Sequence, residues 1–156
     1  MILLVHKDEK VTKITDLESN ELLEISDENP INALFNIASE YQNRILIWCH
    51  ETLQPNLNFE EIKSAFYLNN LMLSYSVYQY LPEQIGYVED SLFLKINKKV
   101  KYPTWLVSSF VGAIYASQLL KFNIKIYKND TFNFALNSIA KLGISKGCLL
   151  YTSDAA

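Results

Sequence analysis

His50 and Glu51 follow Trp48 and Cys49 at the end of a continuous apolar run, residues 44–49 (RILIWC). Such a run is typical of a strand buried on both faces. Ligands in open α/β sheets bind outside the carboxyl ends of strands, so we expect His50 and Glu51 at the rim of a cleft. An imidazole and a carboxylate can bind a divalent cation or act as acid and base. The alternative is a structural histidine beside a solvated glutamate, because no third metal ligand is identifiable.

Glu89 and Asp90 form a carboxylate pair in a segment that is punctuated by Pro82, Gly86 and Pro103. Loops of this kind on an α/β scaffold often carry binding residues. The pair could hold a metal or orient a substrate hydroxyl. A solvated turn is the alternative interpretation.

Ser109 and Asp130 each precede a segment with helical spacing of apolar residues. We expect Ser109 to cap a helix that continues through Val111 to Leu119, with N-terminal amides that attract a phosphate. Asp130 is expected to cap an amphipathic helix that ends near Gly143, and its carboxylate could act as a base toward a bound hydroxyl. A plain helix cap explains either residue without any ligand.

The elements that must position these residues alternate between strands and helices. Residues 2–6 and 11–17 predict a hairpin, and Asn29 with Pro30 predicts the start of a helix. Further strands are expected at residues 21–25, 44–49, 71–78, 93–96 and 122–127, and further helices after Asn58, Ser109 and Asp130. The alternation predicts one α/β domain with helices on both faces of the sheet.

The composition is that of a globular domain. The chain has 156 residues, of which 49% are hydrophobic and 20% charged. Its formal charge of −3 leaves no basic surplus for binding nucleic acid. Cys49 is the one cysteine before residue 148, which favours a reducing, cytoplasmic location. Residues 105–120 carry no charge but are fewer than a transmembrane helix usually needs, so we expect a buried loop and helix there, with a membrane span as the alternative. A peripheral membrane association also stays open.

The last nine residues, Cys148 to Ala156 (CLLYTSDAA), resemble the in-frame translation of a transposase-based sequencing adapter. This resemblance implies that residues 1–147 are the natural part of the chain and residues 148–156 a non-native tail. The domain would then be incomplete at its C-terminus. The alternative is a genuine strand at residues 149–152.

Two longer segments resemble the N-terminal region of family-2-like bacterial glycosyltransferases. They are IGYVEDSLFLKINKKVKYPTWLVSSFVGAIYAS (residues 85–117) and FNFALNSIAKLGISKG (residues 132–147). The resemblance implies a three-layer, GT-A-like (Rossmann-like) fold with a parallel-centred sheet. It also implies a nucleotide-diphosphate sugar as donor and a divalent metal, Mn or Mg, as cofactor.

The family's motifs are carried over residue by residue. Where the family has its metal-binding Asp-x-Asp, this chain has Cys49, His50 and Glu51 instead. The motif itself is therefore absent, and His50 and Glu51 are the candidate metal ligands at its position. Asn129 and Asp130 stand where the family has Glu-Asp before a helix, which makes Asp130 the nearest match to a catalytic base. The usual nucleotide-binding loop and the later Gln-x-x-Arg-Trp segment are absent.

Two hypotheses about function remain. In the first, the chain is a fragment of a glycosyltransferase and binds the donor through His50 or Glu51 on the metal. Substrate contacts then come from Glu89, Asp90 and Ser109. In the second, it is a noncatalytic, degenerate GT-A-like binding or docking domain, and a catalytic domain follows it in the natural chain.

Overall fold

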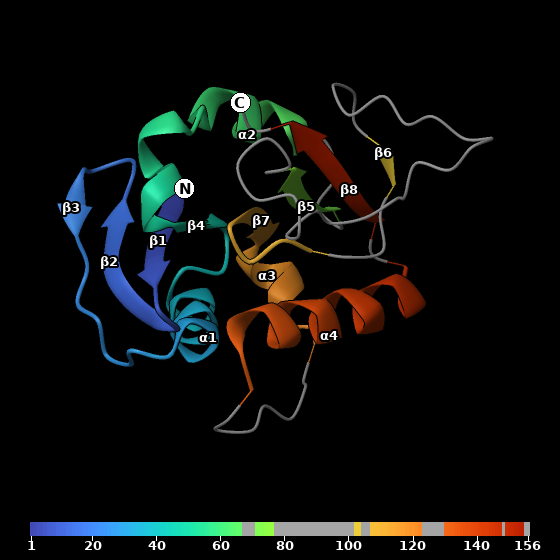
Figure 1. The fold of residues 1–156 in the computed structure, drawn as a ribbon, viewed down its shortest axis with the longest axis horizontal. Coiled ribbons are helices and arrows are strands. Elements are labelled where there is room, and N and C mark those ends of the chain that lie inside the picture. Colours follow the sequence, from blue (N-terminus) through green and yellow to red (C-terminus); the bar gives the residue numbers. More distant parts are fainter. Residues whose placement is uncertain (67–70, 77–101, 104–106, 123–129, 148, 155–156) are drawn as a thin grey trace.

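The computed structural model describes residues 1–66, 71–76, 102–103, 107–122, 130–147 and 149–154 (Figure 1). Glu89, Asp90 and the strand expected at residues 93–96 lie outside this part of the chain. The elements follow in the order β1 (Ile2–Lys7), β2 (Lys10–Asp16), β3 (Glu21–Leu22), α1 (Pro30–Glu40), β4 (Ile45–His50), the 3₁₀ helix η1 (Glu51–Asn56), α2 (Phe59–Ala65), β5 (Leu71–Ser76), β6 (Tyr102–Pro103), β7 (Val111–Tyr115), α3 (Ala116–Leu119), α4 (Phe132–Ser145) and β8 (Leu149–Asp154).

The strands form a mixed sheet in the order β3-β2-β1-β4-β7-β5-β8-β6. Strand β1 is parallel to β4, and β5 is parallel to β8, whereas every other neighbouring pair is antiparallel. The α/β class is therefore confirmed, but the parallel-centred sheet is a correction: antiparallel β7 lies between β4 and β5. Within the parallel pair, Ile2 lies beside Leu46 and His6 beside His50, so both strands end at the same edge.

The hairpin expected at the start of the chain is present. Strands β1 and β2 are joined at Asp8 and Glu9, whose φ angles of 53° and 61° lie in the left-handed region. Two such residues between antiparallel strands match the twist of the sheet, although Asn-Gly is the usual pair there. The backbone strain of about 1 kcal/mol or more per residue has to be offset by contacts of the turn.

Both faces of the sheet are covered. Alternate residues of β1 and β4 point to opposite sides, so Leu4 and Trp48 pack with α1, α3 and α4, while Val5 and Ile47 pack with η1 and α2. Figure 1 shows α1, α3 and α4 on one side of the sheet and α2 on the other. Three layers of secondary structure result, with β4 buried on both faces as expected.

The helix starts show how local sequence fixes these layers. The Asn29 side chain accepts hydrogen bonds from the backbone amides of Ile31 and Asn32, and Pro30 occupies the first turn. Asn58 caps α2 by accepting from the Glu61 amide at 3.2 Å. Both caps are confirmed, because each satisfies amides that the first turn of a helix leaves without a partner.

An ion-pair network ties β2 to the start of β4. Arg44 Nη1 lies 3.2 Å from Asp16 Oδ1 and 3.1 Å from Glu18 Oε1, and the N-terminal amine of Met1 lies 3.1 Å from the same Glu18 oxygen. The Glu18 backbone amide also donates to Asp16. This backbone hydrogen bond, followed by the Arg44 guanidinium, holds the pKa of Asp16 below its usual value.

Two expectations for the second half of the chain are wrong. Residues 111–115 form strand β7 rather than a helix, and only Ala116–Leu119 is helical. Gly143 lies inside α4 rather than at its end; the helix continues to Ser145, and Gly147 adopts the left-handed conformation with φ 84°. The run Val-Gly-Ala-Ile-Tyr satisfies helical spacing, but it is also a continuous apolar run, which a buried strand requires.

Residues 149–154 pair in parallel with β5 as strand β8. Their resemblance to adapter DNA concerns how the residues arose rather than their conformation, and it stays a prediction.

Within the described residues, no helix has the length and apolar character needed to cross a membrane.

Candidate functional site

The carboxyl ends of β1 and β4 bring several polar side chains together at one edge of the sheet. His6 and His50 are register partners there. Strand β7 runs antiparallel to β4 and pairs Val111 with Cys49, so Ser109 also lies at this edge. The backbone amide of His50 donates to the Phe110 oxygen at 2.7 Å. We call His6, Glu9, His50, Glu51 and Ser109 the strand-end cluster.

His6 is the buried member of the cluster, with 6% of its surface exposed. Its Nε2 lies 2.6 Å from the backbone oxygen of Ser109. Burial lowers the pKa of His6 to about 4; the hydrogen bond to Ser109 opposes the shift, and the nearby His50 adds to it. The ring is therefore neutral at pH 7. Because a carbonyl oxygen only accepts, Nε2 carries the proton and donates it to Ser109.

His50 is partly buried and stands perpendicular to His6, with 5.6 Å between the ring centroids. Its Nδ1 lies 3.3 Å from the Thr52 amide and 2.9 Å from the Thr52 hydroxyl. His50 therefore caps the first turn of η1, and its ring also contacts Phe110 at a centroid distance of 4.9 Å. These contacts agree with the alternative interpretation of the sequence, in which His50 is a structural histidine rather than a ligand.

Glu51 has a different set of contacts. Its Oε2 lies 3.7 Å from Lys7 Nζ, and about half of each side chain is exposed. Such exposed pairs contribute about 0–1 kcal/mol to stability. Because Lys7 follows His6 in β1, it points to the opposite face of the sheet. Glu51 thus pairs with Lys7, whereas His50 contacts His6, Thr52 and Phe110.

The N-terminus of α4 is held at the same edge. Thr131 Oγ1 accepts from the Phe134 amide at 3.1 Å, and Glu9 Oε2 accepts from the Phe132 amide at 2.7 Å. The Phe132 ring packs against His6 at a centroid distance of 4.8 Å. A carboxylate at this position also interacts favourably with the helix dipole. These contacts explain why the hairpin turn tolerates its strained conformation at Glu9.

Asp130 does not cap α4, which corrects the expectation from the sequence. Thr131 is the N-cap residue, and Asp130 precedes it. Two neighbouring residues, Asp and Thr, both have side chains suited to capping, so the sequence alone could not choose between them. Asp130 lies two residues before Phe132 and thus near the strand-end cluster, where its expected role as a base stays untested.

Ser109 precedes a strand, so no helix N-terminus stands there to attract a phosphate. Ser109 is 8% exposed, and its backbone oxygen accepts the hydrogen bond from His6. The expected contact between Ser109 and a substrate therefore lacks the helix on which it was based. Glu89 and Asp90, the other expected substrate contacts, lie outside the described residues.

Within the described residues, no group of three or more His, Cys, Asp and Glu side chains could hold a metal ion. Catalytic metal sites in proteins usually have three such ligands. Burial also raises the pKa of the Cys49 thiol to about 12, so this thiol stays protonated and unreactive at neutral pH.

Sequence reasoning missed His6, Glu9 and Thr131 as members or neighbours of the site. His6 ends the first apolar run just as His50 ends a later one, and this repeated strand-end histidine was the available signal. Glu9 offered no comparable signal, because its partner Phe132 lies 123 positions away. Only the fold brings these two residues into contact.

The chain was compared with known proteins at the level of families, sequences and structures. No family model, no curated protein and no solved structure matches it. Its function therefore has to be argued from the residues and contacts described above.

Proposed function

We propose that this chain is a noncatalytic α/β domain of a glycosyltransferase, which binds or docks a neighbouring module rather than the sugar donor. The resemblance of residues 85–117 and 132–147 to family-2-like glycosyltransferases supports the connection with sugar transfer. The three-layer arrangement around a mixed sheet is compatible with a degenerate GT-A-like domain. A catalytic domain downstream in the natural chain would then carry out the transfer.

One observation carries the noncatalytic assignment: the strand-end cluster is already engaged within the domain. His6 donates to Ser109, His50 caps η1, and Glu51 pairs with Lys7. A donor site would need these groups for its ligand. Their contacts instead join β1, β4, η1 and the segment before β7, which is a structural role.

The contacts at the N-terminus of α4 also support the noncatalytic assignment. Amides at a helix N-terminus can bind the phosphates of a nucleotide. Here the Glu9 carboxylate already accepts from the Phe132 amide, and the Thr131 hydroxyl from the Phe134 amide. A diphosphate would have to displace one negative charge and would meet repulsion from it. Donor binding at this edge would therefore have to overcome this repulsion.

Calorimetric titration with nucleotide sugars and Mn²⁺ tests the proposal. The chain, and a version ending at Gly147, should both give no binding heat with UDP-, GDP-, CMP- or dTDP-linked sugars. Heat that is abolished in the His50→Ala, Glu51→Ala double variant would instead establish the donor-binding hypothesis, provided that the variant keeps its thermal transition. Loss of the same heat in Asp130→Asn would place that carboxylate at the donor.

The link to sugar transfer is tested separately, by the genomic sequence that continues after the codon for Gly147. We expect the uninterrupted reading frame to encode a second α/β domain with its own Asp-x-Asp motif. A frame that ends or continues without such a domain would contradict the connection with a glycosyltransferase.

A further inference from the structure

A cavity of about 250 Å³ lies between α1 and the adjoining β2 and β3 region, away from the strand-end cluster. Its apolar lining comes from Ile14, Ala33 and Ile37, which are buried. Its polar lining includes Glu24 and Glu40, which are exposed. The cavity thus has an apolar floor and an acidic rim.

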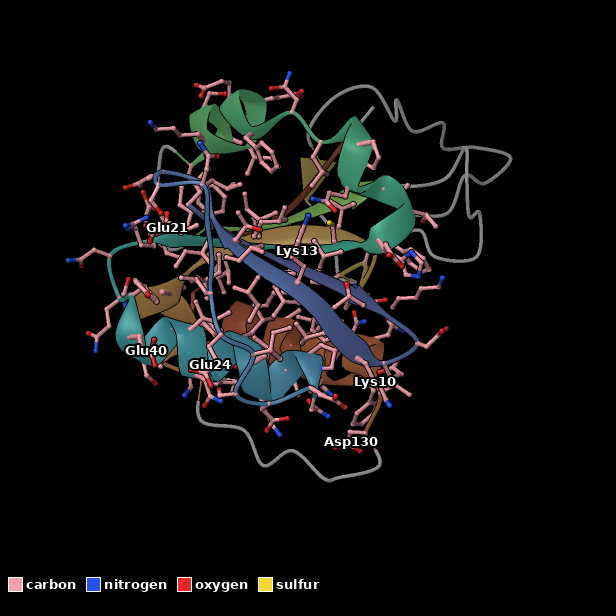
Figure 2. The ribbon with its side chains drawn as sticks, turned by 90° about the vertical axis from the view of Figure 1, so that its left-hand side faces the viewer. Lys10, Lys13, Glu21, Glu24, Glu40 and Asp130 are labelled. Atoms are coloured by element: carbon pink, nitrogen blue, oxygen red, sulfur yellow. The ribbon has the colours of Figure 1, made fainter. Side chains whose placement is uncertain are left out.

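The two rim glutamates, Glu24 and Glu40, line the same cavity. Figure 2 shows Glu24 and Glu40 next to one another on the face turned to the viewer, whereas Glu21 lies farther along the same face. Within the described residues, neither carboxylate forms an ion pair: Lys10 pairs with Glu28, and Arg44 pairs with Asp16 and Glu18. No lysine or arginine is among the described residues that line the cavity. Among the described residues, no lysine or arginine therefore neutralises Glu24 or Glu40 through an ion pair.

The wider charge pattern strengthens this local field. Residues 1–66 contain more than twice as many acidic as basic residues. Lys13, the basic residue next to cavity-lining Ile14 in β2, points to the opposite face of the sheet by strand alternation. A cation near the cavity is therefore attracted, and an anion such as a nucleotide diphosphate is repelled.

The size of the cavity limits the ligand. Pockets for drug-sized molecules usually enclose roughly 300–1,000 Å³, so a cavity somewhat smaller than this suits a single side chain. Arginine and lysine bury an alkyl stem along apolar surface while their charged heads remain at the rim. A guanidinium is planar and has five N–H donors, which allows it to contact two carboxylates at once.

We propose that this cavity docks an arginine side chain presented by a partner polypeptide. The alkyl stem lies over Ala33 and Ile37, and the guanidinium binds Glu24 and Glu40. This inference is independent of the proposed function, because the cavity shares no residue with the strand-end cluster. It identifies a site for a basic partner whether or not the domain belongs to a glycosyltransferase.

Titration followed by amide NMR tests the inference. N-acetyl-arginine amide and butylguanidine should produce saturable shifts at Ala33, Ile37 and Tyr41. Butylurea, which is neutral and similar in shape, should not. The double variant Glu24→Gln, Glu40→Gln should raise the dissociation constant about tenfold, since each exposed charge pair contributes modestly. The matched control Glu21→Gln removes one nearby charge outside the cavity and should change it less than twofold.

Four results would overturn the inference. Equal weakening by Glu21→Gln would mean a diffuse acidic field, and equal binding of butylurea would mean an apolar cavity without charge recognition. Binding of butylguanidine but not of N-acetyl-arginine amide would exclude a polypeptide source. Absence of saturable shifts at Ala33, Ile37 and Tyr41 in the correctly folded chain would exclude the site itself.

Discussion

Replacing Trp48 by alanine is expected to lower the free energy of unfolding by about 3–5 kcal/mol, the usual cost of removing a buried tryptophan. Trp48 has no exposed surface and packs in the same core cluster as α1, α3 and α4. Its ring lies 6.4 Å from that of Phe132, and its Nε1 donates to the Ser108 oxygen at 3.0 Å. The substitution therefore removes a core anchor that lies directly behind the strand-end cluster. Urea unfolding monitored by circular dichroism measures the loss.

Two control variants separate packing from hydrogen bonding at Trp48. Trp48→Phe keeps an aromatic ring but loses the indole donor to Ser108, so we expect a smaller loss of about 1–2 kcal/mol. Phe134→Ala removes an aromatic ring that is 59% exposed on α4 and should cost less than about 0.5 kcal/mol. A Trp48→Ala variant no less stable than Phe134→Ala would contradict the placement of β4 in the core.

Stability is expected to fall by about 3 kcal/mol as the pH is lowered from about 7 to 4, because of His6 alone. The pKa of His6 is about 4 in the folded chain and 6.5 as its ordinary value. Between these values the unfolded chain binds the proton and the folded chain does not, so unfolding is favoured as the pH falls. The stabilisation is complete above pH 6.5 and lost by about pH 4. Urea unfolding at closely spaced pH values measures the slope.

The His6→Gln variant should abolish this slope, because glutamine can donate from a similarly placed nitrogen but does not titrate. His50→Asn keeps His6 and should retain most of the slope. Asp16 does not confuse the measurement: its lowered pKa gives stability that is present above the ordinary carboxyl pKa and is lost only as the pH falls through the lower, folded value. A slope between pH 7 and 4 that persists in His6→Gln would contradict the buried, neutral state of His6.

Local sequence was sufficient where an element is specified by neighbouring residues. The β1–β2 hairpin, the Asn29 and Pro30 start of α1, and the buried strand β4 were all predicted. Each has a short-range cause: alternation of apolar residues, a capping side chain, or a continuous apolar run. The beginning of α4 was predicted too, with an error of one residue in its cap.

Contacts between distant segments could not be predicted in the same way. The sequence of β7 fits both the spacing of a helix and the burial of a strand. It forms a strand because it pairs with β4, a contact between distant segments. The site depended even more on such contacts, since His6 meets Ser109 across 103 positions and Glu9 meets Phe132 across 123. Sequence reasoning identified His50 from its place at a strand end. The contacts of its ring with His6 and Phe110 depend on the fold and could not be predicted.

The most direct test of a structural role for the strand-end cluster is a long-range ¹H–¹⁵N NMR spectrum of the imidazoles of His6 and His50. We predict that His6 is the neutral tautomer with its proton on Nε2 at pH 7. Neither ring should shift when a nucleotide sugar and Mg²⁺ are added together. A donor-dependent shift at both rings that is lost in the Glu51→Ala variant would contradict the noncatalytic assignment and restore a donor site at the ends of β1 and β4.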